Sequence, residues 1–121
     1  MAMDDFFTVR EDEGVVIVTL QQPQILDAVT IERMAAGLKE LFDRDAHDRF
    51  VFDFANVTYL SSSALGILIG LQRRAVQGKK QLKFAGIREE IMEVFRITKL
   101  DTVFDIYKDA KSASEASRKN L

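Results

Sequence analysis

The sequence predicts an α/β fold in which about four helices pack on a mixed, mostly parallel sheet of about five strands, in a single domain spanning residues 1–121. Runs of β-branched and aromatic residues alternate with segments of helical periodicity, and strands separated by helices are typical of parallel sheets. Two strand-like runs near the N-terminus are separated only by a short polar turn, which indicates an antiparallel hairpin at one edge. With 121 residues, of which 47% are hydrophobic, the chain can bury one core. The predicted order is ββαβαβαβα.

The hairpin is predicted from the runs Phe6–Arg10 and Val15–Leu20, on either side of the polar turn Glu11–Gly14. The second run is more continuously apolar, so we expect that strand to lie deeper in the sheet. A loop over residues 21–26 contains Pro23, the only proline. It leads to Asp27, which we interpret as the N-cap of the next helix.

An amphipathic helix is predicted after Asp27, because apolar side chains recur at helical spacing on one face and charged side chains on the other. The apolar positions are Ile31, Met34, Ala35, Leu38, Leu41 and Phe42. The only histidine, His47, lies in the charged loop that follows. We predict it to be an exposed loop residue, because the partners that a metal site needs are absent around it.

The centre of the chain reads as a buried strand followed by a helix that is apolar on nearly every side. The strand is predicted over Phe50–Ala55, and three serines, Ser61–Ser63, stand where the helix N-cap belongs. The helix is predicted from Ala64 onwards and ends at Gly78, interpreted as a C′ residue.

The apolar surface of this helix is wider than a single stripe, which leaves part of it for a partner protein. Gly66 and Gly70 lie one turn apart and would let another backbone approach closely. That backbone belongs either to a partner or to the protein's own sheet, and we favour packing on the sheet.

The C-terminal half alternates short strands and helices. The predicted elements are the strand Leu82–Ala85, a turn at Gly86, the helix Glu89–Phe95, the strand Thr102–Phe104, and a last helix from Ala110 to about Ser117 with a frayed tail to residue 121. Asp109 is the predicted N-cap of the last helix.

Composition narrows the possible functions. The net charge of −2, with both signs mixed, argues against nucleic acid or an anionic membrane as the main partner. The absence of cysteine excludes disulfides and thiolate chemistry, and no apolar run approaches a membrane span. The N-terminus lacks the order of a signal peptide. We therefore expect a cytoplasmic protein, a monomer or weak dimer, without a metal or cofactor.

Three consecutive hydroxyls at a helix start have two interpretations. One serine can cap the helix by accepting a hydrogen bond from a free N–H group of the first turn. The other interpretation is a phosphate site, because the free N–H groups and the helix dipole favour an anion there. Spacing alone favours capping. Since loops after parallel strands meet at one sheet edge, we expect Asp27 to lie near Ser61–Ser63, either as a cap alone or to orient a hydroxyl or cation.

The segment from Asp53 to Leu68, DFANVTYLSSSALGIL, resembles the signature of STAS domains, in particular that of the stand-alone anti-sigma factor antagonists of bacteria. Leu26-Asp27-Ala28 is similar to the Leu-Asp-Ala of the family's first helix, and residues 82–107 are similar to its C-terminal half. The resemblance covers nearly the whole chain and implies a STAS-like (SpoIIAA-like) fold.

The resemblance also implies a binding switch. In this family a GHKL-type serine kinase, itself an anti-sigma factor, phosphorylates the first serine after an aspartate. The unphosphorylated antagonist binds the kinase and frees the sigma factor, and a phosphatase resets the system. Carried over, Ser62 takes the acceptor position, with Ser61 and Ser63 as alternatives. The implied partner-binding residues are Asp27, Ser61, Ser62, Ser63, Ala64 and Leu65.

Two positions depart from the family's pattern. Ser61 replaces the aspartate before the acceptor, and Ala64 replaces the glycine after the serine pair. The missing carboxylate favours an alternative function, in which the chain is an unphosphorylated STAS interaction subunit of a stressosome-like or transporter-associated complex.

The sequence argues against an enzyme. It contains neither a Gly-x-Ser-x-Gly elbow nor a Walker A loop. His47 precedes the central strand and belongs to the end opposite the serines, so a serine hydrolase would lack its base. Asp53 is placed mid-strand, facing solvent or paired, which does not suit a phospho-aspartate receiver.

Overall fold

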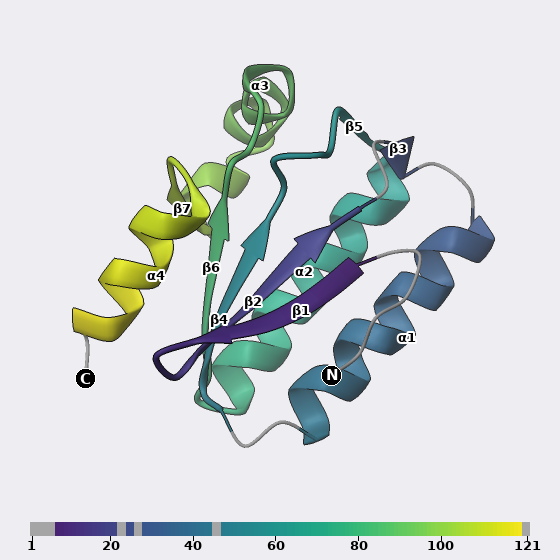
Figure 1. Cartoon of the computed structure of the whole chain (residues 1–121). Coiled ribbons are helices and arrows are strands. Elements are labelled where there is room, and N and C mark those ends of the chain that lie inside the picture. The colour runs from purple at the N-terminus through teal and green to yellow at the C-terminus, as the bar shows by residue number, and fades with distance from the viewer. Residues whose placement is uncertain (1–6, 22–23, 26–27, 45–46, 120–121) are drawn as a thin grey trace.

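The computed structural model describes residues 7–21, 24–25, 28–44 and 47–119. Five strands form one sheet in the order β1-β2-β4-β6-β7, in which β1 is an antiparallel edge strand and the other pairs are parallel (Figure 1). These strands are β1 (Phe7–Asp12), β2 (Val15–Leu20), β4 (Arg49–Asp53), β6 (Gln81–Ala85) and β7 (Asp105–Tyr107). A separate small sheet pairs β3 (Gln24–Ile25) with β5 (Tyr59–Leu60). The predicted α/β architecture is confirmed.

Four helices accompany the strands. They are α1 (Ala28–Arg44), α2 (Ser62–Gln77), α3 (Glu89–Ile97) and α4 (Ala110–Lys119), and a 3₁₀ turn covers Leu100–Thr102. Within the described residues, no helix combines the length and apolarity needed to cross a membrane.

The first hairpin has a tighter turn than the sequence suggests. Glu11 and Asp12 continue β1 and pair with Val16 and Val15, so only two residues remain for the turn. Both of them, Glu13 and Gly14, have positive φ angles, of 49° and 83°. Two-residue turns of this kind match the twist of the strands, which is why pairing extends to them. The predicted turn Glu11–Gly14 is therefore corrected, whereas the deeper position of β2 is confirmed by its continuous burial.

One face of the sheet carries the larger core and is covered by α1 and α2 (Figure 1). Aromatic rings meet across this layer: Phe42 of α1 packs edge-on against Phe50 of β4 at 4.7 Å, measured between ring centroids. Phe84 of β6 stacks on Phe104 at 4.4 Å, and Phe95 brings α3 into the same cluster.

The opposite face is covered by α4, whose contacts run to β2, β4, β6 and β7. The core on this side is small and consists of Val15, Ile17, Val51, Ala85 and Ala113. The N-cap predicted for α4 is confirmed, because the backbone N–H of Ser112 donates to Asp109 Oδ1 at 2.8 Å. This hydrogen bond holds the pKa of Asp109 below its ordinary value.

The last strand lies further along the chain than predicted. Thr102–Phe104 is not a strand: Thr102 ends the 3₁₀ turn, which is preceded by Lys99 with a left-handed φ of 62°, and Val103 is its C-cap. The buried Phe104 ring belongs to the core, and pairing with β6 starts only where Asp105 lies opposite Lys83. The Lys83 ammonium is buried, and burial alone would lower its pKa, but the hydrogen bond to Asp105 at 2.6 Å and its charge raise the pKa overall.

Several boundaries shift by a few residues. β4 ends at Asp53 rather than Ala55, α2 begins at Ser62 rather than Ala64, and α3 continues to Ile97. Gly78 is the C-cap of α2 with φ of −85°, and Lys79 beyond it adopts the left-handed conformation expected of the glycine.

Candidate functional site

The loop that leaves β4 is held in place from two sides. Asp53, the half-buried last residue of β4, accepts a hydrogen bond from the N–H of Ala55 at 3.0 Å. Arg88, just before α3, donates to the Ala55 carbonyl oxygen at 3.1 Å. Gly86 has a φ of +69°, and a Cβ there would lie 2.9 Å from Asp53 Oδ1, so the predicted glycine turn is confirmed and closely fitted.

The small β3–β5 sheet brings two distant loops together. Gln24 pairs with Tyr59 and Ile25 with Leu60, so the segment after β2 lies beside the segment that leads into α2. The sequence placed these loops at one sheet edge but did not predict the pairing, because two-residue strands carry no periodicity. Asp27 lies outside the described residues, and its expected proximity to the serines stays a prediction.

The three serines at the start of α2 have different environments. Ser61 is the N-cap: its Oγ accepts a hydrogen bond from the N–H of Ala64 at 3.2 Å, and its carbonyl accepts from Leu65 N–H at 3.1 Å. Ser62 and Ser63 are exposed, and neither hydroxyl makes a hydrogen bond within the described part of the chain. No acidic residue stands in the first turn of α2. Capping therefore accounts for one serine and leaves two.

The other predicted partner-binding residues differ in exposure. Leu65 is half-buried and packs against the core, so part of its side chain remains accessible to a partner. Ala64 is completely buried. Its methyl group packs in the core and is not at the surface. The expectation that Ala64 contacts a partner therefore does not agree with its burial.

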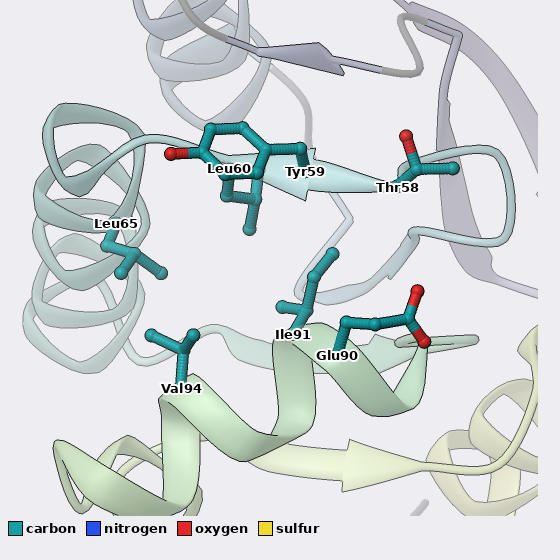
Figure 2. A pocket seen from close by; sticks show the side chains of 7 residues that line it. All are labelled: Thr58, Tyr59, Leu60, Leu65, Glu90, Ile91 and Val94. Atoms are coloured by element: carbon teal, nitrogen blue, oxygen red, sulfur yellow. The ribbon is translucent and has the colours of Figure 1, made fainter.

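An apolar hollow of about 210 Å³ lies beside the serines, between β5, the first turn of α2 and α3. We call it the Tyr59 hollow; it is lined by Thr58, Tyr59, Leu60, Leu65, Glu90, Ile91 and Val94. Figure 2 shows Leu65, Ile91 and Val94 pointing into the space below Tyr59 and Leu60. Sequence analysis missed this feature. Its edge includes Val94 of α3, an apolar residue that is 41% exposed.

A model of the STAS domain matches residues 6–113 of the chain. This chain belongs to the STAS domain family. Over 81 residues, the STAS domain is 31% identical to the anti-sigma-B factor antagonist of Staphylococcus epidermidis, covering 67% of this chain and 74% of that protein. It is an anti-sigma factor antagonist-like STAS domain, and such domains are non-catalytic.

Solved structures share the fold of this STAS domain at lower identity. An anti-sigma factor antagonist domain from Planctomyces limnophilus superposes with a TM-score of 0.79 at 20% identity, covering 96% of this chain and 99% of that one. Bacillus SpoIIAA in its phosphorylated form gives a TM-score of 0.68 at 15% identity, covering 91% of this chain and 98% of that one. The SpoIIAA-like fold expected from the sequence is confirmed.

The outer face of α2 in this STAS domain differs from the sequence interpretation. Gly66 and Gly70 are exposed, and a Cβ on either would meet no atom within 4 Å. The interpretation that they pack closely on the protein's own sheet is wrong, because the sheet is contacted by Ala64, Leu68 and Leu71 on the other side of the helix.

His47 lies in the loop before β4 and has a contact with another element. Its imidazole Nε2 makes a close contact with Glu11 of β1, and the residue, predicted to be exposed, is half-buried. Among the described residues, no group of three side chains is arranged to hold a metal ion.

Proposed function

We propose that this STAS domain is a cytoplasmic anti-sigma factor antagonist, and that phosphorylation of Ser62 ends its binding to a GHKL-type anti-sigma factor kinase. The observation that carries the proposal is that the helix cap and the exposed candidate acceptor are different serines at the start of α2. Ser61 caps the helix, while the hydroxyl of Ser62 is exposed and makes no hydrogen bond within the described residues. Modification of Ser62 therefore leaves the cap intact.

The relatives support the class of partner and the kind of chemistry. The Staphylococcus epidermidis relative is named for antagonism of an anti-sigma factor, and SpoIIAA, which shares the fold, occurs in phosphorylated and unphosphorylated forms. A kinase would transfer the γ-phosphoryl group of ATP: the Ser62 Oγ–P bond forms, the bond to ADP breaks, and the hydroxyl proton leaves.

The physical effect of the phosphate is local. It adds about two negative charges at a helix N-terminus, where free N–H groups stabilise it and no carboxylate of the first turn repels it. A partner surface pressed against the same turn must desolvate that charge. A penalty of a few kcal/mol lowers affinity by about tenfold to several hundredfold.

The test is to incubate the protein with ATP and each GHKL kinase encoded in the same genome, and to map phosphate by mass spectrometry. We expect phosphate on Ser62 that is lost in Ser62→Ala and retained in the matched variant Ser63→Ala. Ser62→Asp should weaken binding of that kinase by about tenfold or more at unchanged thermal stability. Phosphate that persists in Ser62→Ala would overturn the assignment of Ser62.

One observation favours a second function. Ser61 occupies the position at which the anti-sigma factor antagonists of the family have an aspartate. In that case the protein is an unmodified interaction subunit of a larger assembly. Ser61→Asp separates the two, because aspartate caps a helix as well as serine does and restores the carboxylate. If no kinase modifies either form, and the unmodified protein copurifies in a stable assembly, the scaffold function replaces the switch.

A further inference from the structure

We propose that the Tyr59 hollow receives an apolar side chain of the partner kinase, accompanied by a cationic group that pairs with Glu90. This inference rests on the proposed function, and it names the surface that would recognise the partner in addition to the serine that would be modified.

The lining and size of the hollow suit a single large apolar side chain. Leu60, Leu65, Ile91 and Val94 supply its walls, and its volume is about 210 Å³. The consecutive elements β5 and α2 meet the distant helix α3 there, so the shape is set by the fold and not by one loop. Binding pockets are typically apolar walls with a few polar groups at the edge.

Apolar surface is left exposed around the hollow. Tyr59 is 52% exposed and Val94 is 41% exposed. Ile97, which lies three residues after Val94 on α3, is 81% exposed and extends the same stripe of the helix. Contiguous exposed apolar residues of this kind mark interaction sites, and singly scattered ones do not.

The charge at the edge selects the occupant. Glu89 is engaged by Arg96 at 2.6 Å, and this hydrogen bond lowers the pKa of Glu89. Its neighbour Glu90 lines the hollow and makes no ion pair within the described residues. The face of the Tyr59 ring also attracts a cation. A lysine or arginine beside the apolar anchor therefore fits, and an acidic residue does not.

The position of the hollow links recognition to the switch. Leu60 and Leu65 flank the serine turn in sequence, and Ser62 lies between them on the chain. We expect a partner seated in the hollow to contact the turn that carries Ser62, and a phosphate on that turn would have to be desolvated in the complex.

The first test uses a small probe and requires no kinase. Benzamidine combines an aromatic ring with a cation, and benzoate has the same ring with a negative charge. In NMR titrations of the protein, we expect benzamidine to shift the signals of Tyr59, Leu65 and Val94 saturably. Benzoate should bind about two- to fivefold more weakly, and Glu90→Gln should remove the difference.

Equal binding of both probes, or shifts that lie elsewhere, would overturn the inference. If the same signals move when the protein alone is diluted, a second copy of the chain occupies the hollow, and the inference is likewise overturned.

The second test measures affinity for the kinase that binds wild-type protein. Val94→Glu and Glu90→Lys should each weaken binding by about tenfold or more. Their matched controls are Val76→Glu, on the exposed C-terminal part of α2, and Glu32→Lys, on exposed α1. Both controls should stay within about twofold of wild type.

The two proposals fail separately. If Ser62→Asp weakens kinase binding while Val94→Glu and Glu90→Lys do not, the hollow is not the docking site and the switch stands. If the hollow variants weaken binding while Ser62→Asp does not, the docking site stands and the phosphoserine switch is lost.

Discussion

Ser61 and Ser62 are neighbours of the same chemical type with separate positions in the structure. The φ and ψ angles of Ser61, −74° and 164°, are those of an extended N-cap, and they aim its hydroxyl at the N–H of Ala64. Ser62 is already the first helical residue, so it is not the N-cap, and its hydroxyl makes no hydrogen bond within the described residues. The cap and the candidate acceptor are therefore separable by mutation.

We predict that Ser61→Ala lowers the free energy of unfolding by about 1 kcal/mol. For a domain of this size this corresponds to a fall in Tm of about 4 °C. The matched change Ser63→Ala removes an exposed hydroxyl without a cap and should stay within about 0.5 kcal/mol of wild type. Urea unfolding followed by circular dichroism measures both. Equal losses in the two variants would contradict the assignment of the cap.

The three hydroxyls show what residue-level sequence reasoning can resolve. A serine at a helix start is a strong indication of capping, and capping was correctly predicted. Which of Ser61, Ser62 and Ser63 performs it depends on the residue at which the backbone turns from extended to helical. That point comes directly after β5, whose pairing with β3 local sequence does not reveal.

At the scale of elements, two glycines lower the intrinsic helix propensity of α2, although the helix packs on the main core of the protein. Glycine in a helix interior costs about 0.5–1 kcal/mol relative to alanine, and α2 contains Gly66 and Gly70. Neither is required by packing, because a Cβ would meet open space. In α1, by contrast, a Cβ on Gly37 would lie 3.1 Å from the ring of Phe7.

We predict that Gly66→Ala raises the free energy of unfolding by about 0.5–1 kcal/mol. Gly37→Ala makes the same change in a helix where the Phe7 ring must give way, so its gain should be smaller or reversed in sign. Parallel chemical denaturation of the two variants checks the difference. If Gly66→Ala destabilises the protein, the outer face of α2 packs against something in the monomer.

The elements were predicted unevenly, for reasons that depend on their length. The long helices and the buried strands have clear periodicity and were found with boundaries shifted by a few residues. Strand β7 was predicted three residues early because Val103 and Phe104 are good strand residues in isolation. Phe104 is instead used to stack on Phe84, and that contact belongs to the tertiary structure.

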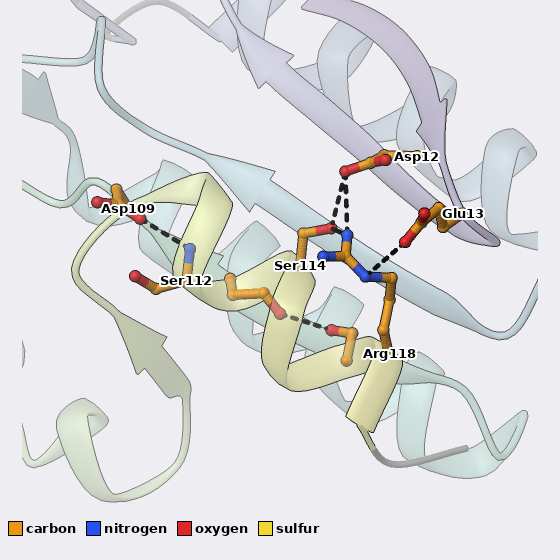
Figure 3. A network of polar contacts seen from close by, with 8 residues as sticks. Asp12, Glu13, Asp109, Ser112, Ser114 and Arg118 are labelled. Carbon is orange, nitrogen blue, oxygen red and sulfur yellow. Dashed lines mark hydrogen bonds and ion pairs between the residues drawn. The ribbon is translucent and has the colours of Figure 1, made fainter.

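At the scale of the molecule, the two faces of the sheet are closed in different ways. The helix α4 is rich in small and polar residues, and Arg118 fastens its C-terminal end to the β1–β2 hairpin (Figure 3). The guanidinium pairs with Asp12 at 3.2 Å and with Glu13 at 2.9 Å, and it donates to Ser114 Oγ at 3.2 Å. The serine turn and the Tyr59 hollow involve no residue of this network.

We predict that Arg118→Ala lowers the free energy of unfolding by about 1 kcal/mol at low ionic strength, and by less in about 1 M salt, because these partly exposed ion pairs are screened. Affinity for the partner kinase should stay within about twofold of wild type, and the stability effects of Arg118→Ala and Ser62→Asp should add. Calorimetry on the single and double variants provides both measurements. A large loss of kinase affinity in Arg118→Ala would mean that the two faces are coupled.

The sequence by itself determined the alternation of strands and helices, the antiparallel edge hairpin, the caps at Ser61–Ser63 and Asp109, and the family resemblance. These properties depend on residues close together in the chain, whose periodicity, backbone preferences and hydrogen-bonding groups act locally. The tertiary structure decided which serine caps, where β7 pairs, that Gly66 and Gly70 face outward, and that β5, α2 and α3 enclose a hollow. Each of these depends on contacts between segments distant in sequence, and such contacts exist only once the sheet has brought those segments together.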